Sequence, residues 1–165
     1  MLERIARRLP LFLRLDHGVF QEIAADDRAT LEAAFIALVA AALSGLGGLL
    51  SRGPLDFLLW LAAGVLVNWL VWAFVARVVG AVAYQSVTRW APVARVLGYA
   101  VAPLALGFFG ILGIGLRLVA WALSLFYGFH AAREVMGLRT EAAAVTVGAS
   151  SLVVLLINVA VQMLL

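Results

Sequence analysis

The sequence predicts an all-α, polytopic membrane protein with five transmembrane helices and an N-terminal amphipathic helix at the membrane interface. Hydrophobic residues make up 65% and charged residues 13% of the 165 residues, against about 45–50% and about 25% in a soluble domain. The apolar residues gather in runs of about 20, the length that crosses a bilayer. The charged residues fall between these runs, so lipid is the solvent that suits this chain.

The first 30 residues are expected to form a cytoplasmic segment, amphipathic at its start and acidic at its end. Residues 2–15 alternate between apolar and basic side chains with helical spacing. A helix lying in the headgroup plane explains this pattern, and a plain cytosolic tail is the alternative. Pro10 is expected to kink or end the helix. The arginines expected to contact lipid headgroups are Arg4, Arg7, Arg8 and Arg14.

Residues 16–30 are the most polar stretch of the chain. Asp26 or Asp27 suits the N-cap of the first apolar helix, where its charge complements the helix dipole. With Glu22 these two residues could form a divalent-cation site. Helix capping and pairing with Arg28 or the N-terminal arginines is the interpretation that we favour.

Residues 31–165 are expected to form the transmembrane domain, with spans at about 31–50, 55–76, 93–112, 114–135 and 142–165. Gly53 and Pro54 predict a turn after the first span, and the second helix can continue to Tyr84. Pro103 predicts a kink in the third span. Glycines at 107–115 predict a tight turn into the fourth, and residues 130–141 predict a charged loop before the fifth.

The arginines predict the orientation of these spans. With five spans, ten arginines fall on the side of the N-terminus and two, Arg52 and Arg117, on the other. Basic residues accumulate on the cytoplasmic side, so the N-terminus is expected in the cytoplasm and the C-terminus outside. Every basic residue is Arg, and Ala, Leu and Val are abundant. This composition is typical of a GC-rich coding sequence, and we expect the cytoplasmic membrane of a prokaryote.

The sequence gives little support for catalysis or metal binding. There is no Cys, which excludes disulfides and thiolate chemistry. His17 and His130 are the only histidines, and their separation does not match a zinc motif. No nucleophile elbow or phosphate-binding loop is present. We therefore expect no enzyme activity, no metal or other cofactor, no nucleic-acid partner and no identified small-molecule substrate.

Polar and small residues within the spans have two interpretations each. Asn68, Asn158 and Gln162 are expected to bond between helices, although they could line a solute path. The small residues recur at four-residue spacing and allow close helix packing, either within the chain or in an oligomer. They are Ala37, Ala41 and Gly45, then Ala40, Ser44 and Gly48, and in the last span Ala144 and Gly148.

The charged stretch at 130–141 also has two interpretations. Arg133 and Glu134, with His130, Arg139 and Glu141, could form a docking patch or a proton-linked site. An anchor of positive charge on the cytoplasmic side is the interpretation that we favour, with Glu141 at the N-terminus of the last helix.

Four segments in order resemble the Yip domain family of Rab/Ypt-interacting membrane proteins, and in particular its short bacterial branch. They are VFQEIAADDRAT (19–30), RVLGYAVAP (95–103), GFFGILGIG (107–115) and HAAREVMGLRTEAAAVTVG (130–148). The family-like residues of the third span are Gly98, Tyr99 and Pro103. The resemblance implies five spans with a cytoplasmic N-terminus. The Asp-Leu-Tyr-Gly-Pro element of eukaryotic members is missing, so their role in binding Rab GTPases is not carried over.

The resemblance implies a non-enzymatic protein that acts by contact with membrane lipids, other membrane proteins or itself, as a scaffold or organiser of the membrane. An accessory subunit of a larger membrane complex is an alternative. A small transporter or channel is a second alternative, and it would require a continuous polar path through the spans.

Overall fold

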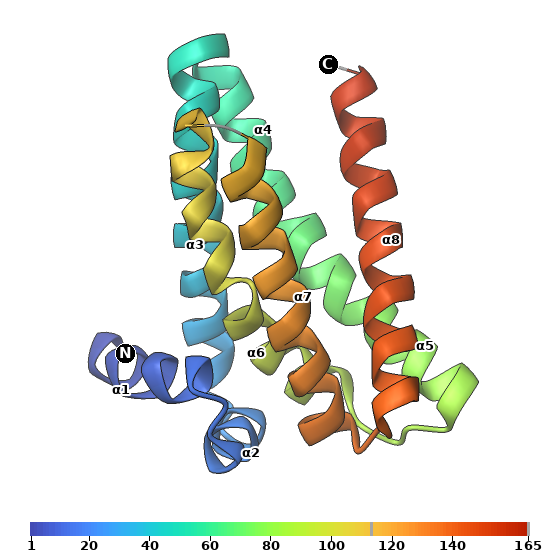
Figure 1. Cartoon of the computed structure of the whole chain (residues 1–165). Coiled ribbons are helices and arrows are strands. Elements are labelled where there is room, and N and C mark those ends of the chain that lie inside the picture. The colour runs from blue at the N-terminus through green and yellow to red at the C-terminus, as the bar shows by residue number, and fades with distance from the viewer. Residues whose placement is uncertain (113, 165) are drawn as a thin grey trace.

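The computed structural model describes residues 1–112 and 114–164, and within this part it omits the side chains at 47, 48, 50–52, 110–112, 114, 162 and 164. The described residues form helices joined by short connections, with no strand among them. Two short helices come first, α1 (Leu2–Leu13) and α2 (His17–Ala25). The remaining helices run along a common bundle (Figure 1). The predicted all-helical class is therefore confirmed.

The bundle begins with α3 (Ala29–Arg52), which turns back into a continuous helical segment made of α4 (Pro54–Val65), η1 (Leu66–Val71) and α5 (Trp72–Tyr84). The expected continuation of the second helix to Tyr84 is confirmed. The chain then returns through α6 (Trp90–Ala100) and η2 (Ala102–Leu112), followed by α7 (Ile114–Met136) and α8 (Thr140–Leu164). The N-terminus and the C-terminus lie at opposite ends of the bundle (Figure 1).

Local sequence explains where the helices end. Gly53 has a φ of 97° and Pro54 follows it at the first position of α4, so the left-handed residue ends one helix and the proline starts the next. Gly137 has a φ of 65° and ends α7. The predicted charged loop at 130–141 was wrong in length, because α7 continues through Met136 and only residues 137–139 connect it to α8.

Three further differences from the sequence predictions have local causes. Helix α2 was not predicted; it starts because the Asp16 carboxylate accepts a hydrogen bond from the Val19 N–H at 3.2 Å. Pro10 lies inside α1 without ending it. In the third span, where Pro103 was expected to cause a kink, the α-helix α6 gives way to the 3₁₀-helix η2, which begins at Ala102.

Within the described ranges, 1–112 and 114–164, four helical segments are long and apolar enough to cross a membrane: Ala29–Leu46, Pro54–Tyr84, Trp90–Phe109 and Thr140–Val161. Many of their large apolar side chains are exposed, including Leu38, Phe74 and Leu156, which suits a lipid environment. Helix α7 runs beside them but carries Arg117 near its start. The segment 1–30 does not have a core of its own, because Phe12, Phe20 and Ile23 share one buried cluster with the bundle.

Small residues bring α3 close to its neighbours within the chain. A Cβ added at Gly64 of α4 would lie 2.2 Å from the Cβ of Ala41, and one at Gly45 would lie 3.2 Å from the Phe57 ring. Ala37 and Ala40 are buried on α3, and the Ser44 hydroxyl donates to the Leu104 carbonyl. Gly48 and Gln162 were also expected to pack or bond between helices, and their side-chain surroundings lie outside the described residues.

We predict that Gly64→Ala destabilises the bundle by about 1–3 kcal/mol, because the added methyl group must displace the backbone at Ala41. Gly148→Ala is the matched control, since nothing lies within 4 Å of the added Cβ, and both changes gain the same helix propensity. Reversible unfolding in mixed detergent micelles measures both. Equal stabilities of the two variants would contradict the close contact between α3 and α4.

Candidate functional site

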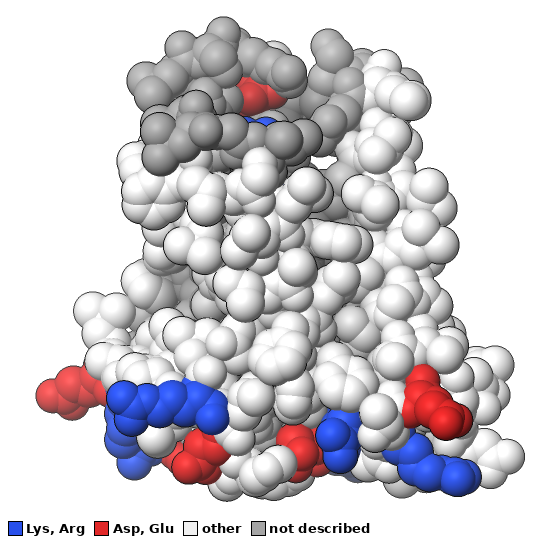
Figure 2. Space-filling view, viewed as in Figure 1, with Lys and Arg blue, Asp and Glu red and all other residues white. Residues whose placement is uncertain are grey.

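The candidate site lies at one end of the bundle, where charged side chains gather (Figure 2). Helices α1 and α2 lie across this end (Figure 1). Helix α1 directs Ile5, Arg8 and Phe12 inward from one face, the spacing of successive helical turns. Arg8 is only 4% exposed, which is unusual for an arginine and requires paired partners.

Three carboxylates surround Arg8. Its guanidinium donates to Glu32 at 2.8 Å, to Asp26 at 2.8 Å and, through Nε, to Glu22 at 3.0 Å. Burial alone would lower the pKa of Arg8, but the hydrogen bonds to Asp26, Glu32 and Glu22 raise it above its ordinary value. The Arg8 hydrogen bond in turn lowers the pKa of the Asp26 carboxyl. Each group thus favours the charged form of the other.

Glu32 is the central acceptor of this cluster. It lies in the first turn of α3 and is fully buried. Arg4 pairs with its Oε1 at 2.7 Å, while Arg8 and the Tyr99 hydroxyl approach its Oε2 at 2.8 and 2.5 Å. We call Arg4, Arg8, Glu22, Asp26, Glu32 and Tyr99 the ion cluster. It joins α1 and α2 to α3 and α6.

A second arginine fixes α2 to the bundle. Arg95 of α6 is 7% exposed. Its guanidinium donates to the Ala24 carbonyl at 2.8 Å and to the Thr30 hydroxyl at 3.0 Å, and it pairs with Asp27. These partners lie at the end of α2 and the start of α3, so Arg95 holds the connection between the two helices.

Aromatic rings form the apolar floor beside the ion cluster. Phe12 is fully buried, and its ring centroid lies 4.6 Å from that of Phe20 and 5.7 Å from those of Tyr99 and Tyr127. The Tyr127 hydroxyl donates to the Leu13 carbonyl at 3.1 Å. Tyr99 therefore serves both parts, because its ring packs against Phe12 while its hydroxyl bonds Glu32.

The charged residues near the end of α7 have separate partners. Glu134 pairs with His17 of α2 at 2.9 Å, and the Gln21 amide donates to the Glu134 carbonyl. Arg133 instead lies over the Phe129 ring at 5.8 Å, and the His130 ring nitrogen contacts the Phe126 carbonyl. Arg133 and Glu134 therefore do not act as one pair, and Glu134 connects α7 to α2.

The four arginines expected at lipid headgroups have different surroundings in the structure. Arg8 and Arg4 point toward Glu32 in the ion cluster. The Arg7 side chain is 62% exposed while pairing with Glu22 at 2.5 Å, and Arg14 is exposed. Of the family-like residues, Tyr99 joins the ion cluster, Gly98 lies against Ala33 and Trp69, and Pro103 is the second residue of η2.

Glu22 and Asp26 pair with the N-terminal arginines Arg7 and Arg8, which is the interpretation favoured from the sequence, whereas Asp27 pairs with Arg95. Within the described part of the chain, no group of three or more His, Cys, Asp or Glu residues is placed to hold a metal ion. Asp26 also accepts a hydrogen bond from the Arg28 N–H at 3.0 Å, just before α3 begins.

Sequence reasoning missed the importance of Glu32 and Arg95. Neither was singled out: Glu32 falls at the start of the first predicted span, and Arg95 is one of the ten arginines assigned to the side of the N-terminus. A usable signal existed, because an ionisable residue inside an apolar helical run must find a partner. The partner itself could not be identified from spacing, since Arg8 and Glu32 are 24 residues apart.

The comparisons with known proteins agree with the predicted resemblance. The family model described as the Yip1 domain matches residues 16–161, which confirms the family. No curated protein and no solved structure matches the chain. Arg4 and Arg8 precede the matched residues, whereas Glu22, Glu32 and Tyr99 lie within them.

We predict that Arg8→Met lowers the free energy of unfolding by about 3–5 kcal/mol, because it removes the buried guanidinium that pairs with the fully buried Glu32 and with the partly buried Asp26. Arg7→Met is the matched control on the same helix; its exposed pair with Glu22 contributes about 0–1 kcal/mol. Unfolding in mixed micelles measures both variants. If both lose the same stability, the ion cluster does not hold α1 in place.

Proposed function

We infer the function of this chain from its family and from its geometry. The chain belongs to the Yip1 domain family, and its long, apolar helices indicate an integral membrane protein. We propose that it is a non-enzymatic protein that organises the membrane by contact with lipids and with other membrane proteins. The observation that carries this proposal is the ion cluster, which fixes two short helices across the charged end of the bundle.

The geometry of that end favours binding over chemistry. The carboxylates of the ion cluster are paired with arginines, and Glu32 also accepts a hydrogen bond from the Tyr99 hydroxyl, so they offer no free base or nucleophile to a substrate. Arginine side chains remain accessible around them, among them Arg7, Arg14 and Arg28, together with exposed carboxylates such as those of Glu3 and Asp27. Exposed arginines next to apolar helices suit anionic headgroups and acidic partners.

We propose that the chain crosses the cytoplasmic membrane of a prokaryote five times, with α7 as the fifth crossing segment. The N-terminus would be cytoplasmic and the C-terminus outside. Two observations support this topology. The termini lie at opposite ends of the bundle (Figure 1), as an odd number of crossings requires. Ten arginines against two then give the expected excess of positive charge on the cytoplasmic side.

Reporter fusions test this topology in cells. We predict that a periplasm-active reporter is active after Leu165 and inactive after Leu138, while a cytoplasm-active reporter gives the opposite result. The short connection at residues 137–139 allows the second fusion without cutting a helix. A C-terminus in the cytoplasm would exclude five crossings.

Lipid binding tests the proposed mode of action. We predict that Arg7→Gln with Arg14→Gln weakens the binding of phosphatidylglycerol to the full protein in mixed micelles by about 1 kcal/mol per arginine. Glu3→Gln is the matched control, because it changes an exposed charge of opposite sign on α1. Native mass spectrometry of bound lipid provides the measurement. Unchanged lipid binding in the double variant would remove anionic lipid as the partner of α1.

Purification from the source in a gentle detergent distinguishes this role from that of an accessory subunit, which would carry a partner at fixed stoichiometry. Flux assays in liposomes distinguish it from a transporter or channel. In a transporter or channel, Asn68 and Asn158 would have to line a polar path. In the structure, Asn158 instead donates to Asn68 at 2.8 Å and to the Val154 carbonyl at 2.9 Å. This pair links η1 to α8.

A further inference from the structure

Helix α5 has a buried face and an exposed apolar face. The buried face contacts the bundle at every fourth residue, through Trp72, Ala76 and Gly80. The exposed face follows the same spacing two positions further on, and its residues are Phe74, Val78 and Val82. Two positions correspond to about 200° around a helix, so the two faces are opposite. Val82 is 80% exposed, so the apolar surface reaches the last turn of α5.

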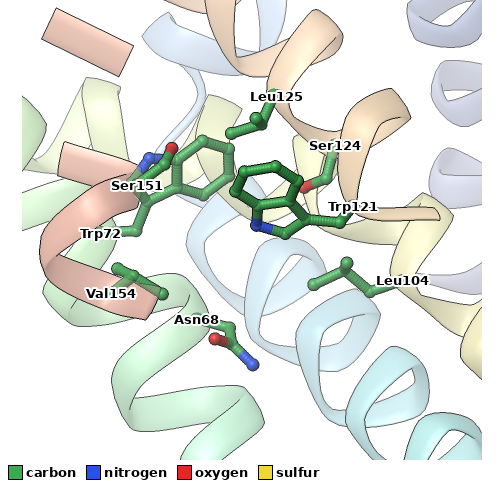
Figure 3. Close-up of a pocket in the computed structure, with 8 residues that line it drawn as sticks. All are labelled: Asn68, Trp72, Leu104, Trp121, Ser124, Leu125, Ser151 and Val154. Carbon is green, nitrogen blue, oxygen red and sulfur yellow. The ribbon is translucent and has the colours of Figure 1, made fainter. Parts of the chain in front are cut away.

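The start of α5 is fixed in the interior of the bundle. Trp72 lies beside a small cavity that Trp121 of α7 and Val154 of α8 also line (Figure 3). Its indole N–H donates to the Ser150 hydroxyl at 3.1 Å. A Cβ added at Gly128 of α7 would lie 2.6 Å from the Trp72 ring. The far end of α5 projects sideways at the charged end of the bundle, on the side opposite to α1 (Figure 1).

The helical segment that ends in α5 is longer than a membrane crossing requires. Pro54–Tyr84 has 31 residues, which correspond to about 45 Å of helix, whereas the hydrocarbon of a bilayer is about 30 Å thick. The segment must therefore tilt in the membrane or extend beyond the hydrocarbon at one end. An end that extends into water would be polar, but the last turn of α5 exposes Val82 and Tyr84. We therefore expect this end at the membrane surface rather than in water.

The connection from α5 to α6 exposes a further apolar side chain. The hydroxyls of Ser86 and Thr88 donate to the carbonyls of Met136 and Val135, at 3.2 and 3.3 Å. These bonds hold the connection against the end of α7. Val87 lies between the two bonded residues, yet it is 94% exposed. The connection is thus fixed to the protein on one side and presents a valine on the other.

Residues that are typical of a membrane interface surround these valines. Tyr84 and Trp90 are both exposed, and aromatic side chains are enriched at the level of the headgroups. Arg77 and Arg89 precede and follow the connection in the chain, and neither forms an ion pair with a described residue. Arg8, by contrast, is paired within the protein. Arginines that lack a carboxylate and lie next to apolar side chains suit lipid phosphates.

We propose that Val82, Tyr84, Val87 and Trp90, here called the apolar corner, form a membrane anchor at the boundary between headgroups and acyl chains. Its partner is the lipid leaflet at the charged end of the bundle, because the apolar corner continues the exposed apolar face of α5. The inference rests on the proposed crossing of the membrane by Pro54–Tyr84, and it is independent of the arginines of α1. Because α1 lies on the other side of the bundle (Figure 1), the two contacts would hold the charged end level with the membrane surface.

Spin-label accessibility in liposomes of phosphatidylethanolamine and phosphatidylglycerol tests the anchor. The chain has no native cysteine, so Val82→Cys and Val87→Cys each carry a single nitroxide. The ratio of its accessibility to oxygen and to a water-soluble nickel chelate rises with depth in the bilayer. The reference sites are Leu152→Cys, exposed in the middle of α8, and Ala25→Cys, exposed at the end of α2. We expect both labels of the apolar corner to give ratios between these two references.

Two results would overturn the proposal. Ratios at Val82 and Val87 equal to that at Ala25 would place the apolar corner in water, where a protein partner would be needed to cover it. Ratios equal to that at Leu152 would place it inside the hydrocarbon rather than at the boundary. All four labelled side chains are exposed, and if one variant of the apolar corner fails to fold, the other still gives its depth.

The same labels in the Arg7→Gln, Arg14→Gln background separate this anchor from the proposed contact of α1 with lipid. The depth of the Val87 label should not change in that background, whether or not the double variant loses phosphatidylglycerol. Loss of bound lipid with an unchanged label depth would support two separate contacts. Movement of the label to the ratio found at Ala25 would show that the apolar corner depends on α1, and it would overturn the proposal of an independent anchor.

Discussion

The buried carboxylate of Glu32 constrains the whole charged end of the molecule. An ionised group in the first turn of an apolar helix is costly unless it is paired and hydrogen-bonded. Arg4, Arg8 and Tyr99 meet that requirement, but Arg4 and Arg8 can do so only if α1 lies across the end of α3. The position of α1 follows from this need, and the apolar side chains of Ile5 and Phe12 then enter the core beside it.

The same constraint determines where α2 lies. Glu22 and Asp26 complete the shell around Arg8, so the end of α2 must approach α1. Arg95 holds the short connection from α2 to α3 through a carbonyl and a hydroxyl, and Glu134 joins α7 to the start of α2. Helices that would be marginal alone at 12 and 9 residues are therefore stabilised by tertiary contacts. This coupling makes the charged end a fixed surface for contact with lipid or protein.

Local signals explain which parts of the fold could be predicted from sequence. Long apolar runs indicated the bundle helices, Gly53 and Pro54 indicated the first turn, and Pro103 indicated an interruption. The ion-pair partners of the charged residues could not be predicted from such local signals. Arg8 looked like Arg7 on a helical surface, yet one is buried and the other is exposed, because the difference depends on carboxylates 14 to 24 residues away. Helix α2 escaped notice because it has only 9 residues and lies within the most polar stretch of the chain.

One rule connects the two polar regions of this membrane protein. In an apolar medium each buried polar group needs a partner, and the fold meets this need differently in the two places. At the charged end, the carboxylates and guanidinium groups of the ion cluster neutralise one another. In the interior, side chains of neighbouring helices bond one another instead: Asn158 donates to Asn68, and the Trp72 indole N–H donates to the Ser150 hydroxyl.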